Sequence, residues 1–320
     1  MDNHNKRISR ADRLLFQQEI HREVEKGTEK EKEFNEMVQK MDLLIRKYFP
    51  DAYANFSPPS FEYMERHYNI VIGVATGFED EVIIDDSNAF TFVSAVRYID
   101  NFIDEALWPI LEEKNNTHSL QEGFEEKFYA FIDEVYKEVQ VYDIYLPEEV
   151  VDLPKIEIKM FLNPDQETLD NLLEKYIDNK SFNLAYIDHL VTKRRPAEMS
   201  VWDDAEKCKY RLMALWDISR DVSDWADSTD FDLFYHIYSN NLDPENLKKI
   251  IFEVIKQVSP SLFDVVSKPR AKERETYYSM AQEAMEKDDV SQKEQFLLNG
   301  CLSILKFIDE SSQFEFDAVA

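Results

Sequence analysis

The sequence predicts an all-α protein, a bundle of roughly ten helices packed around one core. Apolar residues recur at three- and four-residue steps through most of the chain, as on the buried face of a helix. The 320 residues contain only five glycines, which argues against an all-β chain with many tight turns. Hydrophobic residues make up 44% of the chain, so a protein of this length can bury a large core.

The predicted helices are separated by prolines and by residues that cap helix ends. We expect helices over residues 30–48, 60–77, 87–109, 119–142 and 165–192, the last as one helix or a pair. Residues 198–241 contain no Gly or Pro and predict one long helix or two stacked ones, followed by a helix that Pro244 opens. Final helices are expected over 268–287 and 290–310.

The least regular part of the prediction is the segment around three prolines. Pro147, Pro154 and Pro164 indicate a connector, in which residues 156–162 form either a helix or a short strand. For the chain as a whole we expect a charged N-terminal arm over 1–28, helical or disordered. A single helical domain follows over 29–312, and then a C-terminal tail over 313–320.

Composition excludes several classes of function. The net charge of −28 argues against general binding to nucleic acid or to anionic membranes. No uncharged apolar run reaches about 18 residues, and the polar N-terminus does not resemble a signal peptide, so we expect no membrane insertion and a cytoplasmic location. With so few glycines there is no Gly-rich phosphate loop, so metal, Arg, Lys or helix ends must hold any bound phosphate. The two cysteines, Cys208 and Cys301, exclude a four-cysteine metal site.

An acidic stripe lies on the helix predicted over 87–109. At about 100° per residue, Arg97, Asp100 and Asp104 fall within roughly 60° of one another, beside the apolar face of that helix. Two carboxylates one turn apart at the edge of a buried face repel each other and cost desolvation energy. Water, Arg97 or a divalent cation could relieve that cost. Because Mg²⁺ takes one or two carboxylates plus phosphate oxygens, the stripe predicts a Mg²⁺ and diphosphate site.

A second acidic stripe lies on the long helix within residues 198–241. Asp217, Asp221, Asp224 and Ser228 fall within roughly 60° of one another, and Arg220 flanks them. Acidic residues are 65 of 320, so a single pair of acids means little, and most such pairs are solvated faces. The functional interpretation depends on the conjunction of two Arg-flanked acidic stripes on apolar-bordered helices.

With these two stripes the chain resembles the class I isoprenoid synthases, and within them the squalene/phytoene synthase branch. The family's first motif is DxxxD, with an Arg three residues upstream in some members. Arg97 and Asp100-Asn-Phe-Ile-Asp104 match it. The second motif reads like N-I-L-R-D-V-G-E-D, and Asp217-Ile-Ser-Arg220-Asp221-Val-Ser-Asp224-Trp225 aligns with it. Tyr277-Tyr278-Ser-Met-Ala-Gln-Glu-Ala is similar to the family's tyrosine-bearing penultimate helix.

The resemblance implies an isoprenoid synthase-like bundle with a central cavity. It also implies a Mg²⁺-dependent terpene synthase, which ionises an allylic prenyl diphosphate and cyclises or rearranges the carbocation. Arg97 and Arg220 would clamp the diphosphate, Trp216 and Trp225 would line the substrate, and Tyr277 and Tyr278 would face the cation. About three Mg²⁺ ions, with Mn²⁺ as an alternative, are implied. Their ligands would be Asp100, Asp104, Asp217, Asp221, Asp224 and Ser228.

Several alternatives stay open. In the second motif, Asp217 replaces Asn, Asp224 replaces Glu, and Trp225 stands where the last Asp is expected. The loss of that carboxylate argues against head-to-head coupling of two prenyl diphosphates, which is the alternative activity. Another register places Asp224, Ser228 and Asp232 at the spacing of the N-S-E metal triad of terpene cyclases. A protein of another class, a non-catalytic helical scaffold whose acidic stripes are solvated, is a further alternative. A homodimer is possible for either class.

Overall fold

The computed structural model describes residues 28–76, 87–111, 123–142, 146–162, 166–192, 199–225, 243–268 and 274–317. Within these ranges the chain forms helices joined by turns and contains no strand, so the predicted all-α class is confirmed. None of the helices described is long and apolar enough to cross a membrane. The predicted N-terminal arm lies outside the described residues except for Thr28, and the predicted tail over 313–320 is helical as far as Asp317.

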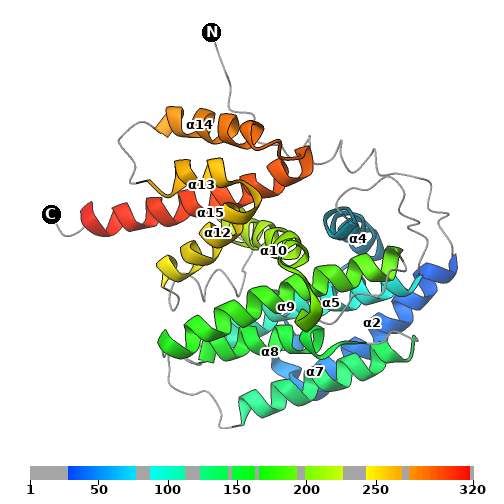
Figure 1. Ribbon diagram of the computed structural model, residues 1–320. Helices are drawn as coiled ribbons and strands as arrows, with labels where there is room; N and C mark the ends of the chain where they lie inside the picture. Colours follow the sequence, from blue (N-terminus) through cyan, green and yellow to red (C-terminus); the bar gives the residue numbers. More distant parts are fainter. Residues whose placement is uncertain are drawn as a thin grey trace.

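The long helix α9 (Gln166–Thr192) runs through the middle of the structure (Figure 1). It contacts α4 (Phe61–Thr76), α5 (Ser87–Phe102), α8 (Glu148–Leu162) and α10 (Asp204–Trp225). On one side α2 (Thr28–Tyr48) packs against α5 and α7 (Phe124–Gln140). Helix α3 (Pro50–Tyr53) is a single turn that packs against α2. Apolar side chains at helical spacing along α9 are fully or almost fully buried: Leu169, Leu173, Tyr176, Ile177, Leu184 and Ile187. The burial of this stripe ties the surrounding helices to α9.

A second group of helices lies beyond α10 (Figure 1). They are α12 (Pro244–Val258), α13 (Pro260–Val266), α14 (Arg274–Lys287) and α15 (Gln292–Asp317). Helix α10 contacts α15 and α12 on one side and α9 on the other. Gly300 of α15 lies against α10, and a Cβ added there would be 2.7 Å from Cδ1 of Trp216 and 2.8 Å from Oγ of Ser219. A glycine is therefore what allows α15 to pack this closely behind Trp216.

Two predicted helix starts are confirmed by their capping contacts. Ser60 Oγ accepts a hydrogen bond from the backbone N–H of Tyr63 at 3.2 Å, one turn into α4. Pro244 is the first residue of α12, and the Asp243 carboxylate accepts from the backbone N–H of Glu245 at 3.0 Å. Each cap satisfies a backbone donor that would otherwise lack a partner at the helix N-terminus.

The predicted irregular connector is wrong, because Pro154 lies inside α8. A proline in a helix interior removes a hydrogen bond to the carbonyl four residues earlier, which here belongs to Val150. The hydroxyl of Tyr136 on α7 donates to that carbonyl oxygen at 3.4 Å. The neighbouring helix thus supplies the donor that the proline lacks, and residues 156–162 continue as helix.

The helix with the first acidic stripe contains an irregular turn that the sequence did not predict. Helix α5 passes into the π-helical turn η1 (Ile103–Leu107), and the chain is helical to Leu111, close to the end predicted at Pro109. The backbone N–H of Trp108 bonds to the Ile103 carbonyl, five residues back. This wider turn directly precedes the proline, whose ring would clash with the Glu105 carbonyl in a regular helix. Asp104 lies within the π-helical turn.

Candidate functional site

A cavity between α4, α5, α8, α9 and α10 brings the two predicted acidic helices together. The volume of this cavity is about 130 Å³. Six of the residues predicted from the sequence line it: Arg97, Asp100 and Asp104 from α5 and its π-helical turn, and Trp216, Asp217 and Arg220 from α10. The described parts of the two stripes therefore open onto the same space and not onto separate surfaces.

Arg97 links the first stripe to α4. Its guanidinium forms an ion pair with Asp100 one turn further along α5. Nη2 and Nε of Arg97 also donate to the hydroxyl of Tyr63, at 3.1 and 3.3 Å. Burial alone would lower the pKa of Arg97, but Asp100 and Tyr63 outweigh it and raise the pKa above its usual value. Arg97 therefore stays charged, and its contacts with Asp100 and Tyr63 hold the guanidinium in one orientation at the cavity wall.

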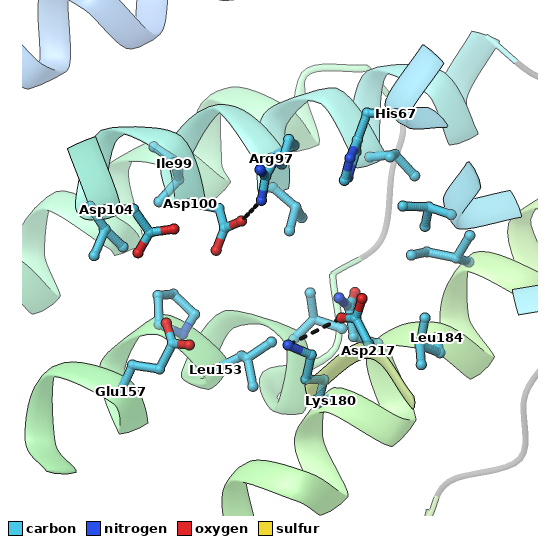
Figure 2. Close-up of a pocket in the computed structure, with 18 of the residues that line it drawn as sticks. His67, Arg97, Ile99, Asp100, Asp104, Leu153, Glu157, Lys180, Leu184 and Asp217 are labelled. Carbon is cyan, nitrogen blue, oxygen red and sulfur yellow. Dashed lines mark hydrogen bonds and ion pairs between the residues drawn. The ribbon is translucent and has the colours of Figure 1, made fainter. Parts of the chain in front are cut away.

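The second carboxylate of the first stripe faces a residue that the sequence did not indicate. In Figure 2, Asp100 and Asp104 reach into the cavity from one side, and Glu157 of α8 reaches in from the other. The hydroxyl of Tyr176 donates to Oε1 of Glu157 at 2.7 Å. Burial raises the pKa of Tyr136 further along the wall, and the charges of Asp100 and Glu157 add to that rise. This end of the cavity is acidic.

The other end carries a group of cations around Asp217. Nζ of Lys180 on α9 lies 3.1 Å from Oδ2 of Asp217, and Nη1 of Arg220 lies 3.8 Å from its Oδ1 (Figure 2 shows the lysine contact). Burial acts to raise the pKa of Asp217, but Lys180 and Arg220 outweigh it and hold that pKa below its usual value. The Arg220 guanidinium also lies 5.5 Å from the centre of the Trp216 ring. Asp217 is thus ionised and holds two cations at the cavity wall.

His67 enters the cavity from α4, near Arg97 (Figure 2). Its ring is stacked with that of Tyr63 one turn earlier, with 6.5 Å between the ring centres. Burial lowers the pKa of His67 well below its usual value, and the charges of Arg97 and Arg220 lower it further, while Asp217 opposes them. His67 is therefore neutral at physiological pH.

The described lining also contains a buried polar atom without a hydrogen bond. Asn183 on α9 is buried, with 9% of its surface exposed, and its Oδ1 has no hydrogen-bond partner among the described residues. Such an acceptor is costly to bury and is satisfied when water or a ligand donates to it.

The rest of the second stripe lies outside the described side chains. Asp221, Asp224 and Trp225 are in α10, but their side chains are not described, and Ser228 and Asp232 lie beyond the described part of the chain. Both registers of the second motif therefore stay predictions.

The same holds for the tyrosine pair. Tyr277 and Tyr278 belong to α14, and their side chains are not described. Helix α14 packs against α13 in the group beyond α10, and none of its described residues lines the cavity (Figure 1). The predicted role of these tyrosines beside a carbocation stays a prediction.

The carboxylates of the lining meet the requirements of Mg²⁺ to different degrees. Among the side chains that the structure describes, no three His, Cys, Asp or Glu residues come together as a metal-binding group. A Mg²⁺ ion that binds together with a diphosphate does not need such a group, because it takes one or two carboxylates, phosphate oxygens and water. Asp100 and Asp104 fit this requirement. Asp217 fits it less well, because both of its oxygens face cations, Lys180 and Arg220, whereas Asp100 is paired with Arg97 through one oxygen.

Three residues of the cavity escaped the sequence argument: His67, Glu157 and Lys180. His67 and Glu157 are each a polar residue among apolar neighbours on their helix, such as His67 beside Ile70 and Val71, and Lys180 lies between Tyr176 and Asn183. One polar residue in an apolar stripe is only a weak sequence signal of a functional site, because a single residue has no spacing that could match a motif.

No family model, no curated protein and no solved structure matches the chain.

Proposed function

We propose that this protein is a Mg²⁺-dependent terpene synthase, which ionises an allylic prenyl diphosphate and cyclises or rearranges the resulting carbocation. The observation that carries the proposal is the shared cavity: Asp100 and Asp104 on one helix, and Asp217 and Arg220 on another far along the chain, line the same space. A scaffold with solvated acidic stripes would have no need to bring them together.

Three cations support the binding of a diphosphate. Arg97, Lys180 and Arg220 line the cavity, and the two guanidinium groups can each donate two parallel hydrogen bonds to phosphate oxygens. Asp217 holds Lys180 and Arg220 in place, and Asp100 and Tyr63 hold Arg97. Because these partners fix the cations before a ligand arrives, little reorganisation is needed when charge builds on the leaving group.

The carboxylates of the first stripe support a role for a divalent cation. Asp100 and Asp104 would repel a diphosphate that approached them alone. A bound Mg²⁺ would be held by these two carboxylates and would supply neutralisation of the charge on the leaving diphosphate. The acidic and cationic ends of the cavity then act on the same anion, the cationic end directly and the acidic end through the metal.

The remainder of the lining supports a hydrocarbon chain as the other half of the substrate. Apolar side chains from α4, α5 and α9 line the cavity: Ile70, Val71, Val93, Val96, Leu184 and Ile187. Such a wall excludes water, which would otherwise capture a carbocation at once. The face of Trp216 can stabilise a passing cation by about 0.5–2 kcal/mol.

The proposal is tested by incubating the protein with Mg²⁺ and geranyl, farnesyl or geranylgeranyl diphosphate. We expect diphosphate release with at least one chain length, loss of release when Mg²⁺ is chelated, and a hydrocarbon or alcohol product from a single substrate. Gas chromatography separates this outcome from coupling of two substrates. The Asp100→Asn variant should lose at least about 100-fold in rate.

The matched control is Asp264→Asn, which alters an exposed carboxylate on α13 far from the cavity lining. It should turn over like the wild type. Absence of diphosphate release with all three chain lengths would contradict the proposed function, and full activity of Asp100→Asn would contradict the metal-binding role of that residue.

A further inference from the structure

The imidazole of His67 is a base inside the cavity. Neither the binding nor the ionisation of a diphosphate requires this base. It shares the cavity with Ile70 and Val71 of its own helix and with Val93 and Val96 of α5. Within the described ranges, no side chain is hydrogen-bonded to the imidazole of His67. None of the described side chains therefore competes with a ligand in the cavity for its nitrogen atoms.

Charged and titratable groups face this ring from each neighbouring wall. Tyr63 stacks on it from α4, Arg97 faces it from α5, and Arg220 and Asp217 face it from α10. Lys180 lines the same cavity from α9 and is paired with Asp217. Burial and the two guanidinium groups lower the pKa of His67, so the ring keeps a free lone pair at neutral pH. The carboxylates Asp100 and Asp217, in contrast, are held in ion pairs.

We propose that His67 is the proton acceptor that ends the reaction by deprotonating the carbocation; this inference rests on the proposed function. In this step a C–H bond adjacent to the cationic carbon breaks, and its electron pair forms a carbon–carbon double bond. The proton binds an imidazole nitrogen of His67 and passes to the released diphosphate. The product is a neutral olefin, and charge and atoms balance between the substrate, the olefin and the protonated diphosphate.

The position of His67 beside Arg97 and Arg220 suits the timing of this step. Before ionisation, burial and the two guanidinium charges keep the imidazole unprotonated. When the carbon–oxygen bond breaks, its electron pair stays on the diphosphate, which gains one more negative charge beside the same two guanidinium groups; this further offsets their charge and favours protonation of His67. A carbocation is a very strong acid, so even a weak base accepts its proton if the base is within reach. Among the described residues of the lining, His67 is the one imidazole.

The inference is tested with His67→Gln and His67→Phe, assayed with Mg²⁺ and the prenyl diphosphate that the wild type turns over. Diphosphate release reports ionisation, and the ratio of olefin to alcohol reports deprotonation against capture by water. We expect release within about threefold of the wild type and a fall of at least about tenfold in the olefin-to-alcohol ratio. His189→Gln, which removes an imidazole of α9 that does not line the cavity, is the matched control and should leave the ratio unchanged.

The outcomes separate the two proposals. An unchanged ratio in both His67 variants, with normal diphosphate release, would overturn the role of His67 and leave the proposed function intact. Absence of release by the wild type with every chain length would overturn both. The phenylalanine variant keeps a ring against Tyr63, so it tests the base even if His67→Gln fails to fold. Loss of folding in both variants would assign His67 to packing and overturn the inference.

Discussion

At the residue scale, Asp217 shows how two ion pairs alter the interpretation of a motif. Sequence spacing predicts it as a metal ligand, yet its carboxylate lies between Lys180 and Arg220. Lys180 is 12% exposed at its side chain, so this ion pair is largely shielded from water. In this arrangement Asp217 positions two cations for a phosphate, and Asp100 and Asp104 remain the described carboxylates best placed for Mg²⁺.

Lys180→Met tests that role. The variant removes one charge from the phosphate-binding wall, and a hydrogen bond to a charged group contributes about 1.5–3 kcal/mol, or about 10–100-fold in affinity. We expect inhibition by inorganic diphosphate to weaken by this factor. Lys175→Met is the control, because Lys175 lies on the same helix with its side chain 54% exposed and does not line the cavity. Equal inhibition of both variants would show that Lys180 does not contact the anion.

The neutral His67 also predicts how stability depends on pH. Its pKa is depressed in the folded protein and returns to about 6.5 in the unfolded chain. Below pH 6.5 the unfolded chain therefore binds one more proton, so the free energy of unfolding falls as the pH falls, by up to about 1.4 kcal/mol per pH unit. This loss continues until the pH reaches the pKa of the folded state.

Urea denaturation at pH 7.5 and 5.5 measures this effect. Many carboxylates also titrate at acid pH, so the informative quantity is the difference between the wild type and His67→Gln. The wild type should lose more stability than the variant between the two pH values. An identical loss in both proteins would mean that His67 is not held neutral by the fold.

At the element scale, the close packing of α15 on α10 makes a prediction of its own. Gly300→Ala gains up to about 1 kcal/mol of helix propensity, but the new methyl group would meet the side chains of Trp216 and Ser219 at under 3 Å. Overpacking of this kind costs about 1–3 kcal/mol, so we expect a net loss of stability. Because Trp216 lines the cavity, its displacement should also lower turnover.

Thermal unfolding compares Gly300→Ala with Asn299→Ala. Asn299 is exposed and precedes Gly300 on α15, so its replacement should be neutral or slightly stabilising. A Gly300→Ala protein as stable as the wild type would show that the two helices separate without cost, and that the glycine is not needed for their contact.

The elements also show where sequence reasoning succeeds and where it stops. Capping residues are local, so the starts of α4 and α12 could be predicted from Ser60 and Pro244. The helix through Pro154 could not, because the donor that satisfies the Val150 carbonyl comes from Tyr136 on another helix. The π-helical turn before Pro109 escaped prediction because a helical stripe does not reveal one inserted residue.

At the scale of the whole molecule, the fold brings together what the sequence keeps apart. The two acidic helices could be paired in advance because each carries several residues at a recognisable spacing beside an arginine. Glu157, Lys180 and His67 each come from a different helix, and their meeting in one cavity depends on how those helices pack. Tertiary packing thus supplies one base, one acid and one cation that no local pattern indicates.

The net charge of the molecule determines what the binding of a diphosphate would need. A protein with a net charge of −28 repels a diphosphate at long range, so binding must depend on local cations and on metal. The described cavity lining contains three cations against four carboxylates, Asp100, Asp104, Glu157 and Asp217. We therefore expect strong binding of the anion to require Mg²⁺.

Calorimetric titration of the protein with inorganic diphosphate, with and without Mg²⁺, tests this requirement most directly. We predict binding that depends on Mg²⁺ and that weakens at least about tenfold in Asp100→Asn, while Asp264→Asn binds like the wild type. Diphosphate binding of equal strength without Mg²⁺, or no binding at all, would contradict a magnesium–diphosphate site between α5 and α10.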